Sequence, residues 1–263
     1  MKRVNATVLA LILVSLPSVV PHAQQAPINW PNGAKAAIVL TYDDAIRSQL
    51  DIAVPQLDAA GFKGTFFLGG TFQQEDVERW RKVAASGHEL ANHSVFHPCA
   101  RGSFDMPDQY NNERYSARTM LTEIRVMNTM LHAIDGGTEL RTYATPCGQS
   151  IVGDGDYIAA LRAAGLVKYV RSTGAPGAGV LDPFNVPGMF FPEATKGSDL
   201  IAFVEAARQR GGLAVLGFHG VGGDYLKVSA EAHQELVNYL EAHQDVFWVA
   251  TFRQALDYAT TSH

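Results

Sequence analysis

The stretch that decides the fold is residues 36–44, AAIVLTYDD, a nearly continuous apolar run that ends in two adjacent carboxylates. Such a run predicts a strand buried on both faces, as in a parallel sheet covered by helices on each side. Residues 64–68, GTFFL, form a second run of this kind. Between the two, residues 48–60 have helical spacing and are followed by Gly61, which is typical of a helix end. The chain therefore begins as strand, helix and strand.

The same alternation continues through the chain. Further strands are predicted at residues 88–92, 140–144, 167–171, 213–218 and 246–249. Further helices are predicted at residues 75–86, 116–134 and 155–164, and after Ser229, where His233, Leu236, Val237 and Leu240 have helical spacing. Residues 99–115 and 172–198 are rich in Gly, Pro and polar side chains, which predicts long loops. The pattern favours an α/β fold, either one barrel or a doubly wound sheet, with chemistry at the strand ends.

Composition and charge restrict the class of protein. The chain has 263 residues, of which 47% are hydrophobic, and this is enough for one sizeable core. The formal net charge is −5 and the sequence pI is near 6.0. Because no basic field is available, neither nucleic acid nor an anionic membrane surface is expected as a partner.

The N-terminus has the features of a secretory signal peptide, predicted over residues 1–23. Lys2 and Arg3 precede an apolar run at residues 8–20, and cleavage is expected after Ala23. A short membrane anchor is the alternative, although the run is shorter than the ~20 residues that span a bilayer. Residues 24–35 would then be a short lead and residues 36–258 one catalytic domain. The protein is expected to be secreted or periplasmic, without stable membrane insertion after cleavage.

Two pairs of polar residues suggest metal chemistry. His93 and His97 are separated by three residues, so both imidazoles can turn onto one metal ion. Asp43 and Asp44 are adjacent and can divide the work of ligand and base. A histidine pair alone is equally consistent with ordinary hydrogen bonding. Because both pairs follow predicted strands, together they favour a metal-assisted hydrolase.

The two cysteines, Cys99 and Cys147, each follow a proline. In an oxidising compartment they could form a disulfide, and two buried free thiols are the alternative. Their spacing does not match a zinc-thiolate site.

Four stretches resemble a known family. Residues 87–98, GHELANHSVFHP, and residues 41–44, TYDD, resemble the second and first motifs of the polysaccharide deacetylases, carbohydrate esterase family 4, also called the NodB-homology family. Residues 61–68 resemble the segment after the family's first helix, and residues 216–220, LGFHG, resemble its last motif. The resemblance extends from about residue 36 to residue 258. It implies a single-domain distorted (β/α) barrel.

The resemblance implies a role for each motif residue. Asp44, His93 and His97 are expected to bind a divalent metal ion that keeps an open position for water and an acetyl carbonyl. Asp43 is expected to act as general base and His219 as general acid. Zinc suits two imidazoles and one carboxylate best, with Co²⁺, Ni²⁺ and Fe²⁺ as alternatives.

The third motif departs from the family pattern. The family commonly has Arg-x-Pro-Tyr, whereas residues 143–148 are YATPCG, with Ala144 in place of the arginine. Arg171 is predicted to replace it as the residue that orients the base, with an ordinary surface arginine as the alternative. Arg101 and Arg141 are weaker candidates. The backbone N–H of Cys147 remains a predicted oxyanion donor, because that role needs no particular side chain.

The fourth and last motifs also depart from the pattern. No Asp-x-x-x-Trp-like motif is recognisable around residues 170–174, and Asp182 is predicted to orient His219 instead. Gly217 stands where the family usually has leucine, which predicts a thinner wall around the acetyl methyl group. The following glycine cluster lacks the Lys-Ser or Lys-Thr of a phosphate loop and is predicted to form a tight turn. Loop aromatics that could stack on sugar rings are Phe96, Phe104, Tyr110, Phe184, Phe190 and Phe191, whereas Trp30, Trp80 and Trp248 are predicted to be structural.

The expected function is metal-dependent removal of N-linked or O-linked acetyl groups from a polysaccharide or oligosaccharide. An acetylated glycan is therefore the expected partner. Acetyl xylan esterase activity is the narrower alternative. A non-catalytic carbohydrate-binding relative is the alternative of another class, favoured by the altered third and fourth motifs. A structural metal site in an unrelated barrel is disfavoured, since such sites usually have four protein ligands and only three can be named here.

Overall fold

The computed structural model describes residues 28–70, 72–176 and 181–261. The predicted signal peptide, residues 1–23, lies outside this part of the chain. Among the residues described, no helix has both the length and the apolar character needed to cross a membrane.

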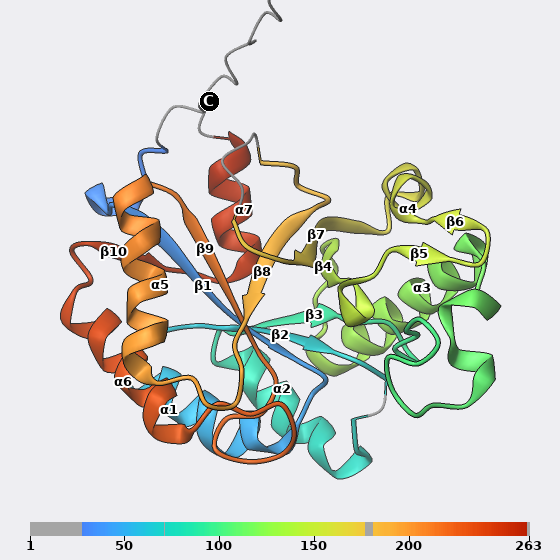
Figure 1. Ribbon diagram of the computed structural model, residues 1–263, viewed down its shortest axis with the longest axis horizontal. Coiled ribbons are helices and arrows are strands. Elements are labelled where there is room, and N and C mark those ends of the chain that lie inside the picture. The colour runs from blue at the N-terminus through green and yellow to red at the C-terminus, as the bar shows by residue number, and fades with distance from the viewer. Residues whose placement is uncertain (1–27, 71, 177–180, 262–263) are drawn as a thin grey trace, which may run out of the picture.

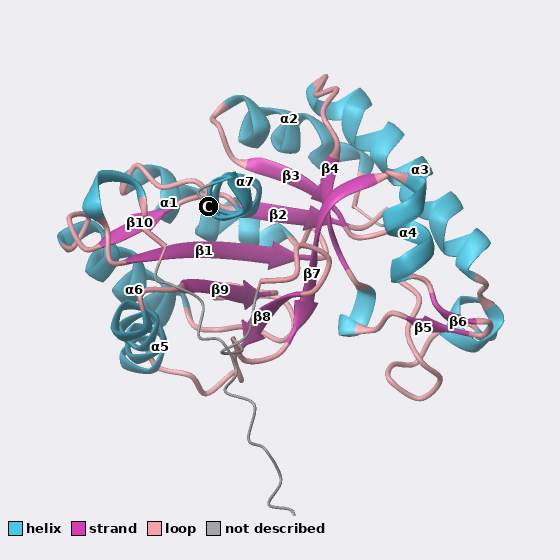
Figure 2. Ribbon diagram, turned by 90° about the horizontal axis from the view of Figure 1, so that it is seen from above, coloured by secondary structure: helices cyan, strands magenta, loops and turns pink. Residues whose placement is uncertain are grey.

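Parallel strands close into a barrel that begins and ends at β1 (Figure 2). Their order around the barrel is β1 (Ala36–Asp43), β2 (Thr65–Leu68), β3 (Glu89–Asn92), β4 (Arg141–Ala144), β7 (Val167–Thr173), β8 (Val186–Phe190) and β9 (Leu213–Phe218). Strand β9 pairs back onto β1 from Ala37 to Tyr42. A further strand, β10 (Phe247–Val249), pairs only with the first residues of β1. Of the two predicted alternatives, a barrel and a doubly wound sheet, the barrel is confirmed.

Strand β1 is the centre of the fold because both of its faces are buried, as its apolar run predicted. Ile38, Leu40 and Tyr42 face outward and pack beneath helices, in one cluster with Trp80 and Leu236. On the other face, Val39 packs against Phe67 and Val215, and against Phe252 and Leu256 of the C-terminal helix. Asp43 continues the alternation and so points to the interior face at the end of the strand.

Helices cover the outside of the barrel. They are α1 (Val54–Ala59), α2 (Val77–Ala85), α3 (Ala117–Asp135), α4 (Ile158–Ala164), α5 (Gly197–Arg210) and α6 (Ala230–Ala242). Helix α7 (Phe252–Thr261) instead packs against the interior face of the strands, where Phe252 and Leu256 meet Val39. Figure 1 shows α5 and α6 side by side on the outer face next to β1 and β9. The predicted N-cap of α6 is confirmed, since the Ser229 hydroxyl accepts from the Ala232 N–H. Gly136 and Gly165 end α3 and α4 in left-handed conformations, which glycine adopts readily.

Several predicted elements were wrong or missing. Residues 172–198 are not one loop, because they contain β8 and the first residues of α5. Strand β8 reads VPGMF, and its Pro187 and Gly188 hide a strand from any propensity argument. Residues 155–156 belong to a small hairpin, β5 (Ile151–Val152) and β6 (Gly155–Asp156), so α4 begins only at Ile158. Helices α5 and α7 were not predicted.

A buried polar chain lies between β1 and the outer helices. The Nδ1 atom of His233 lies 2.5 Å from Gln56 Oε1, and its Nε2 atom lies 2.7 Å from the Tyr42 hydroxyl. Because an amide oxygen only accepts, Nδ1 carries the proton and Nε2 accepts from Tyr42. His233 is fully buried, and burial lowers its pKa to about 4.

We expect the free energy of unfolding to fall as the pH drops from about 6.5 to about 4. In this window the unfolded chain takes up a proton at His233, whereas the folded chain keeps the imidazole neutral. The folded state therefore has its full stability above pH 6.5 and loses stability progressively until the pH reaches about 4. The loss from this group is about 3 kcal/mol at most. Urea unfolding of the wild type and His233→Gln at several pH values measures it. Parallel pH profiles for the two proteins would contradict the assignment.

Candidate active site

Five polar side chains meet at the C-terminal ends of three barrel strands. Asp43 ends β1 and Asp44 follows it. His93 comes directly after β3, with His97 four residues later, and His219 comes directly after β9. The closure of the barrel brings β1 and β9 side by side, so residues far apart in the sequence share one site.

Asp44, His93 and His97 have the arrangement of a metal-ligand set. The Nε2 atoms of the two histidines are 3.1 Å apart, and Asp44 Oδ1 is 3.5 Å from each of them. Tetrahedral zinc with bonds of about 2.0–2.1 Å separates its ligand atoms by roughly 3.4 Å. The spacing of the three donors therefore fits one divalent cation.

The protonation of His93 also suits metal binding. Its Nδ1 atom lies 2.9 Å from the Ala144 carbonyl oxygen, which can only accept, so Nδ1 carries the proton and Nε2 presents a lone pair to the ligand set. Burial lowers the pKa of His93 well below its ordinary value, and neighbouring His97 lowers it further. The imidazole is therefore neutral, the form that binds metal.

The loop between the two histidines is held by buried polar groups. Ser94 and His97 have positive φ values of 65° and 50°, and the Ser94 hydroxyl accepts from the His97 N–H at 3.1 Å. Glu123, from α3, accepts from the N–H groups of Val95 at 3.2 Å and Phe96 at 3.0 Å. No motif pointed to Glu123. Its signal was a carboxylate on the apolar stripe of a predicted helix, between Met120, Ile124 and Met127.

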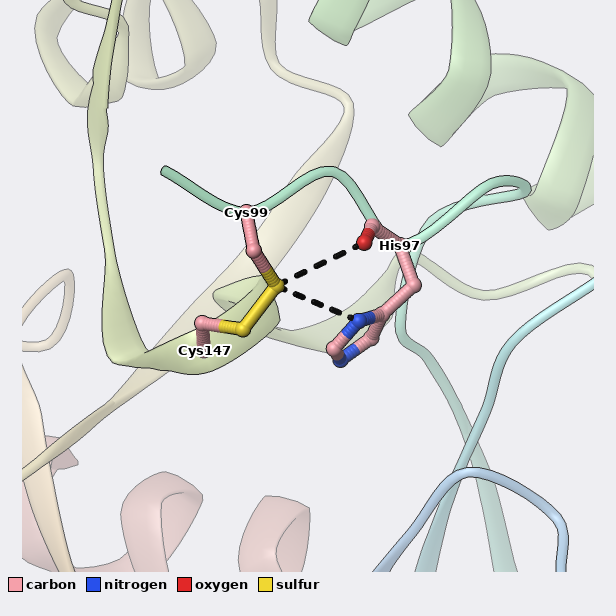
Figure 3. A group of neighbouring side chains, drawn as sticks. All are labelled: His97, Cys99 and Cys147. Atoms are coloured by element: carbon pink, nitrogen blue, oxygen red, sulfur yellow. Dashed lines mark hydrogen bonds between the residues drawn. A yellow bond between two sulfur atoms is a disulfide. The ribbon is translucent and has the colours of Figure 1, made fainter. Parts of the chain in front are cut away.

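A disulfide joins this loop to the turn after β4. Cys99 and Cys147 are bonded, with 5.8 Å between their Cα atoms. Figure 3 shows the Cys99 sulfur beside His97, 3.5 Å from its Nδ1 atom. Cys147 lies in the turn Pro146–Gly148 and has a positive φ of 53°. Because both sulfurs are bonded to each other, they do not offer thiolate ligands.

Asp43 forms a buried ion pair with Arg171. Asp43 is 3% exposed and Arg171 is 1% exposed, and the Arg171 Nη2 atom donates to Asp43 Oδ2 at 2.5 Å. The guanidinium also lies over the rings of Phe67 and Phe190. Asp43 Oδ1 has no hydrogen-bond partner among the described residues. The other two arginines considered are paired elsewhere, Arg101 with Asp108 and Arg141 with Asp135.

Comparison with known proteins identifies the family. The model of the polysaccharide deacetylase family matches residues 31–168, slightly more than half of the chain. The chain belongs to the polysaccharide deacetylase family.

Three solved structures share the barrel. A proposed polysaccharide deacetylase from Mycobacterium smegmatis is 21% identical, with a TM-score of 0.63 over 91% of this chain and 95% of that one. The carbohydrate esterase family 4 domain of a multidomain xylanase from the hindgut metagenome of Trinervitermes trinervoides is 18% identical, with a TM-score of 0.57 over 85% and 90%. A family 4 pseudoenzyme from Bacillus anthracis is 17% identical, with a TM-score of 0.51 over 86% and 67%. These likenesses confirm the predicted distorted barrel.

Curated relatives match over shorter stretches. A gellan lyase from a Bacillus species is 28% identical over 120 residues, which are 45% of this chain and 5% of the lyase. The uncharacterized protein YlxY of Bacillus subtilis is 34% identical over 76 residues, 28% of this chain and 24% of YlxY. The chain thus spans a quarter or less of the curated relatives it matches.

His219 in this deacetylase-family protein lies beside the ligand set. Its Nε2 atom is 3.7 Å from Asp44 Oδ2, and its ring packs against Phe190 at 5.0 Å between centroids. A Cβ atom added at Gly217 would lie 2.5 Å from the Phe190 ring. The sequence predicted a thinner wall at Gly217. The Phe190 ring instead occupies the space that a side chain at this position would fill.

The predicted partner of His219 was wrong. Asp182 is half exposed and accepts from Arg162 at 2.8 Å and from the Phe184 N–H at 2.9 Å. Its carboxylate is thus engaged at the surface. Tyr225 also contacts the ligand set, since its hydroxyl donates to Asp44 Oδ2 at 2.9 Å. Sequence reasoning did not name this residue.

Some of the loop aromatic residues are exposed, whereas others pack against the protein. Phe96 is 48% exposed and stacks on Tyr110, and Phe104 is also exposed. Phe191 packs inward against Phe218, and Phe184 lies beneath the Arg162 guanidinium. The three tryptophans have structural contacts: Trp80 is buried against Phe66, and Trp30 packs with Trp248.

Replacing both cysteines by serine should lower the free energy of unfolding by about 2–4 kcal/mol, because the bond spans a sequence separation of 48 residues. Urea unfolding of the wild type and of the Cys99→Ser, Cys147→Ser variant measures the difference. Wild-type protein treated with a dithiol reductant serves as the matched control and should unfold like the variant. Equal stability of oxidised wild type and variant would contradict the expectation.

Proposed function

We propose that this protein is a metal-dependent hydrolase that removes N-linked or O-linked acetyl groups from a polysaccharide or oligosaccharide. The observation that carries the proposal is the convergence of Asp44, His93 and His97 beside a buried second carboxylate, Asp43. Membership of the polysaccharide deacetylase family supports the same reaction.

Zinc is the proposed metal, with Co²⁺, Ni²⁺ and Fe²⁺ as alternatives. Two neutral imidazoles and one carboxylate are a donor set that zinc accepts, and three protein ligands leave a position open. When bound, the cation supplies Lewis acidity, which makes water more acidic and polarises an acyl carbonyl. The ligands would be Asp44 Oδ1, His93 Nε2 and His97 Nε2.

Asp43 is proposed as the general base. Arg171 holds its Oδ2 atom and balances the buried charge, while Oδ1 has no partner among the described residues and is free to accept a proton from water. Arg171 thereby takes the orienting role of the family's usual third-motif arginine, from the neighbouring strand β7. Ala144, which stands at the position of the family's arginine, is paired with Arg171 across β4 and β7. A side chain from either position can therefore reach Asp43.

His219 and Cys147 are proposed to act on the substrate itself. The imidazole of His219, one-fifth exposed at the side-chain level, can donate a proton to the departing alcohol or amine. The backbone N–H of Cys147, in the turn after β4, would donate to the developing oxyanion.

A non-catalytic carbohydrate-binding protein is the second candidate. The altered third and fourth motifs favour it, and a pseudoenzyme with this fold is known. The buried Asp43–Arg171 pair argues against it, because a binder has no need of an unpartnered carboxylate oxygen beside a ligand set. Secretion or a periplasmic location is proposed as well, and is supported by the disulfide, which persists in oxidising compartments.

Acetate release by the zinc-supplied protein should occur on acetylated xylan or on N-acetylglucosamine oligomers, and should fall by about 10²–10⁴-fold in Asp43→Asn. An enzymatic acetate assay on both substrates also separates an acetyl xylan esterase from an amidohydrolase. The exposed Asp105→Asn change is the matched control and should leave the rate unaltered. Absence of acetate from both substrates, with glycan binding retained, would support the non-catalytic alternative.

His219→Ala should slow amide hydrolysis by about 10²–10⁴-fold and ester hydrolysis by less, since an amine must be protonated to leave whereas an alkoxide departs more readily. The measurement compares the variant with the wild type on N-acetylated and O-acetylated substrates. His132→Ala, on the exposed side of α3, is the control. Equal losses on both substrate types would remove His219 from the proton-donor role.

A further inference from the structure

Tyr225 contacts the ligand set from a loop that no motif explains. It lies on the segment between β9 and α6, is 54% exposed, and donates its hydroxyl to Asp44 Oδ2 at 2.9 Å. Its ring lies 6.1 Å from the ring of His219. The phenol therefore touches the residue proposed as metal ligand and flanks the proposed acid.

The two oxygens of Asp44 have different surroundings. Oδ1 is 3.5 Å from the Nε2 atoms of both His93 and His97. Oδ2 is 2.9 Å from the Tyr225 hydroxyl and 3.7 Å from His219 Nε2. The hydrogen bond from the phenol to Oδ2 restricts rotation of the carboxylate and so keeps Oδ1 beside the two imidazoles.

We propose that Tyr225 is a positioning residue of the metal site, which holds Asp44 so that Oδ1 alone binds the cation. The inference rests on the proposed function, since it assumes that Asp44, His93 and His97 bind a metal. Partners that orient metal ligands in this way typically contribute 10–100-fold to metal affinity or activity.

The loop is built to present this phenol. Asp224 and Leu226, on either side of Tyr225, both have positive φ values, 61° and 46°. The Asp224 carboxylate accepts from the Ser48 N–H at 2.8 Å, and the Tyr225 carbonyl accepts from the Gly220 N–H at 3.2 Å. Left-handed residues other than glycine cost energy, and they persist only where their surroundings enforce them.

The glycines around this loop explain its tight path. A Cβ atom at Gly220 would lie 2.0 Å from the Gly223 carbonyl oxygen, so no larger residue fits there. Ser48 also accepts the Val221 N–H through its hydroxyl, at 3.2 Å. Because Ser48 follows Asp44 by four residues, the segment that carries the ligand also anchors the loop that orients it.

Tyr225→Phe, which removes only the hydroxyl, should weaken zinc binding by about 10–100-fold. The dissociation constant is measured by competition with a chromophoric chelator, using the full mature protein. Acetate release at saturating zinc should return close to the wild-type rate. Tyr258→Phe is the matched control, since its hydroxyl donates to the Asn29 carbonyl away from the site, and it should bind zinc like the wild type.

The outcomes separate the two proposals. Zinc binding by Tyr225→Phe within about twofold of the wild type, while Asp44→Ala abolishes binding, would overturn the role of Tyr225 and leave the metal site intact. Unchanged zinc affinity together with a lower rate at saturating zinc would also overturn it, because the phenol would then act on the substrate. Zinc binding that Asp44→Ala does not affect would overturn the proposed metal site and the inference together. Urea unfolding confirms that each variant is folded.

Discussion

Two adjacent carboxylates at the end of a fully buried strand are the constraint on which the rest of the site depends. A buried carboxylate is costly unless it is paired or hydrogen bonded. Asp43 is paired with Arg171, and Asp44 is surrounded by two histidines and a phenol. These partners come from β7, from the loop after β3 and from the segment after β9, so the barrel must close before the charges at the end of β1 are compensated. Compensation of the two carboxylate charges therefore depends on the closed barrel.

The sequence predicted the parts of this arrangement that local patterns record. The apolar run before Asp43 predicted a strand buried on both faces, and β1 has that character. The spacing of His93 and His97 predicted that both rings could meet, and their Nε2 atoms are 3.1 Å apart. Positions directly after strands predicted a shared edge, because the carboxyl ends of parallel strands lie at one end of a barrel.

The remaining features depend on contacts between distant segments, which no local pattern contains. Strand β8 was hidden by Pro187 and Gly188, yet a Cβ atom at Gly188 would lie 2.9 Å from the Arg171 side chain. The glycine that weakens the strand signal therefore makes room for the arginine that holds Asp43. Glu123 and Tyr225 are similar cases, since each gains its meaning from backbone or side-chain atoms that the fold brings to it.

Gln49 links two site residues that are far apart in the sequence. Its buried amide group donates both to the Asp43 carbonyl and to the His219 carbonyl, which is 170 residues away in sequence. One amide group therefore holds the backbone of both the proposed base and the proposed acid. In addition, β1 lacks its longest strand partner until β9 has been made. Contacts of such separation form late, and they leave an apolar edge open in the meantime. During synthesis, β1 therefore has an open edge that can pair with other chains until β9 has been made.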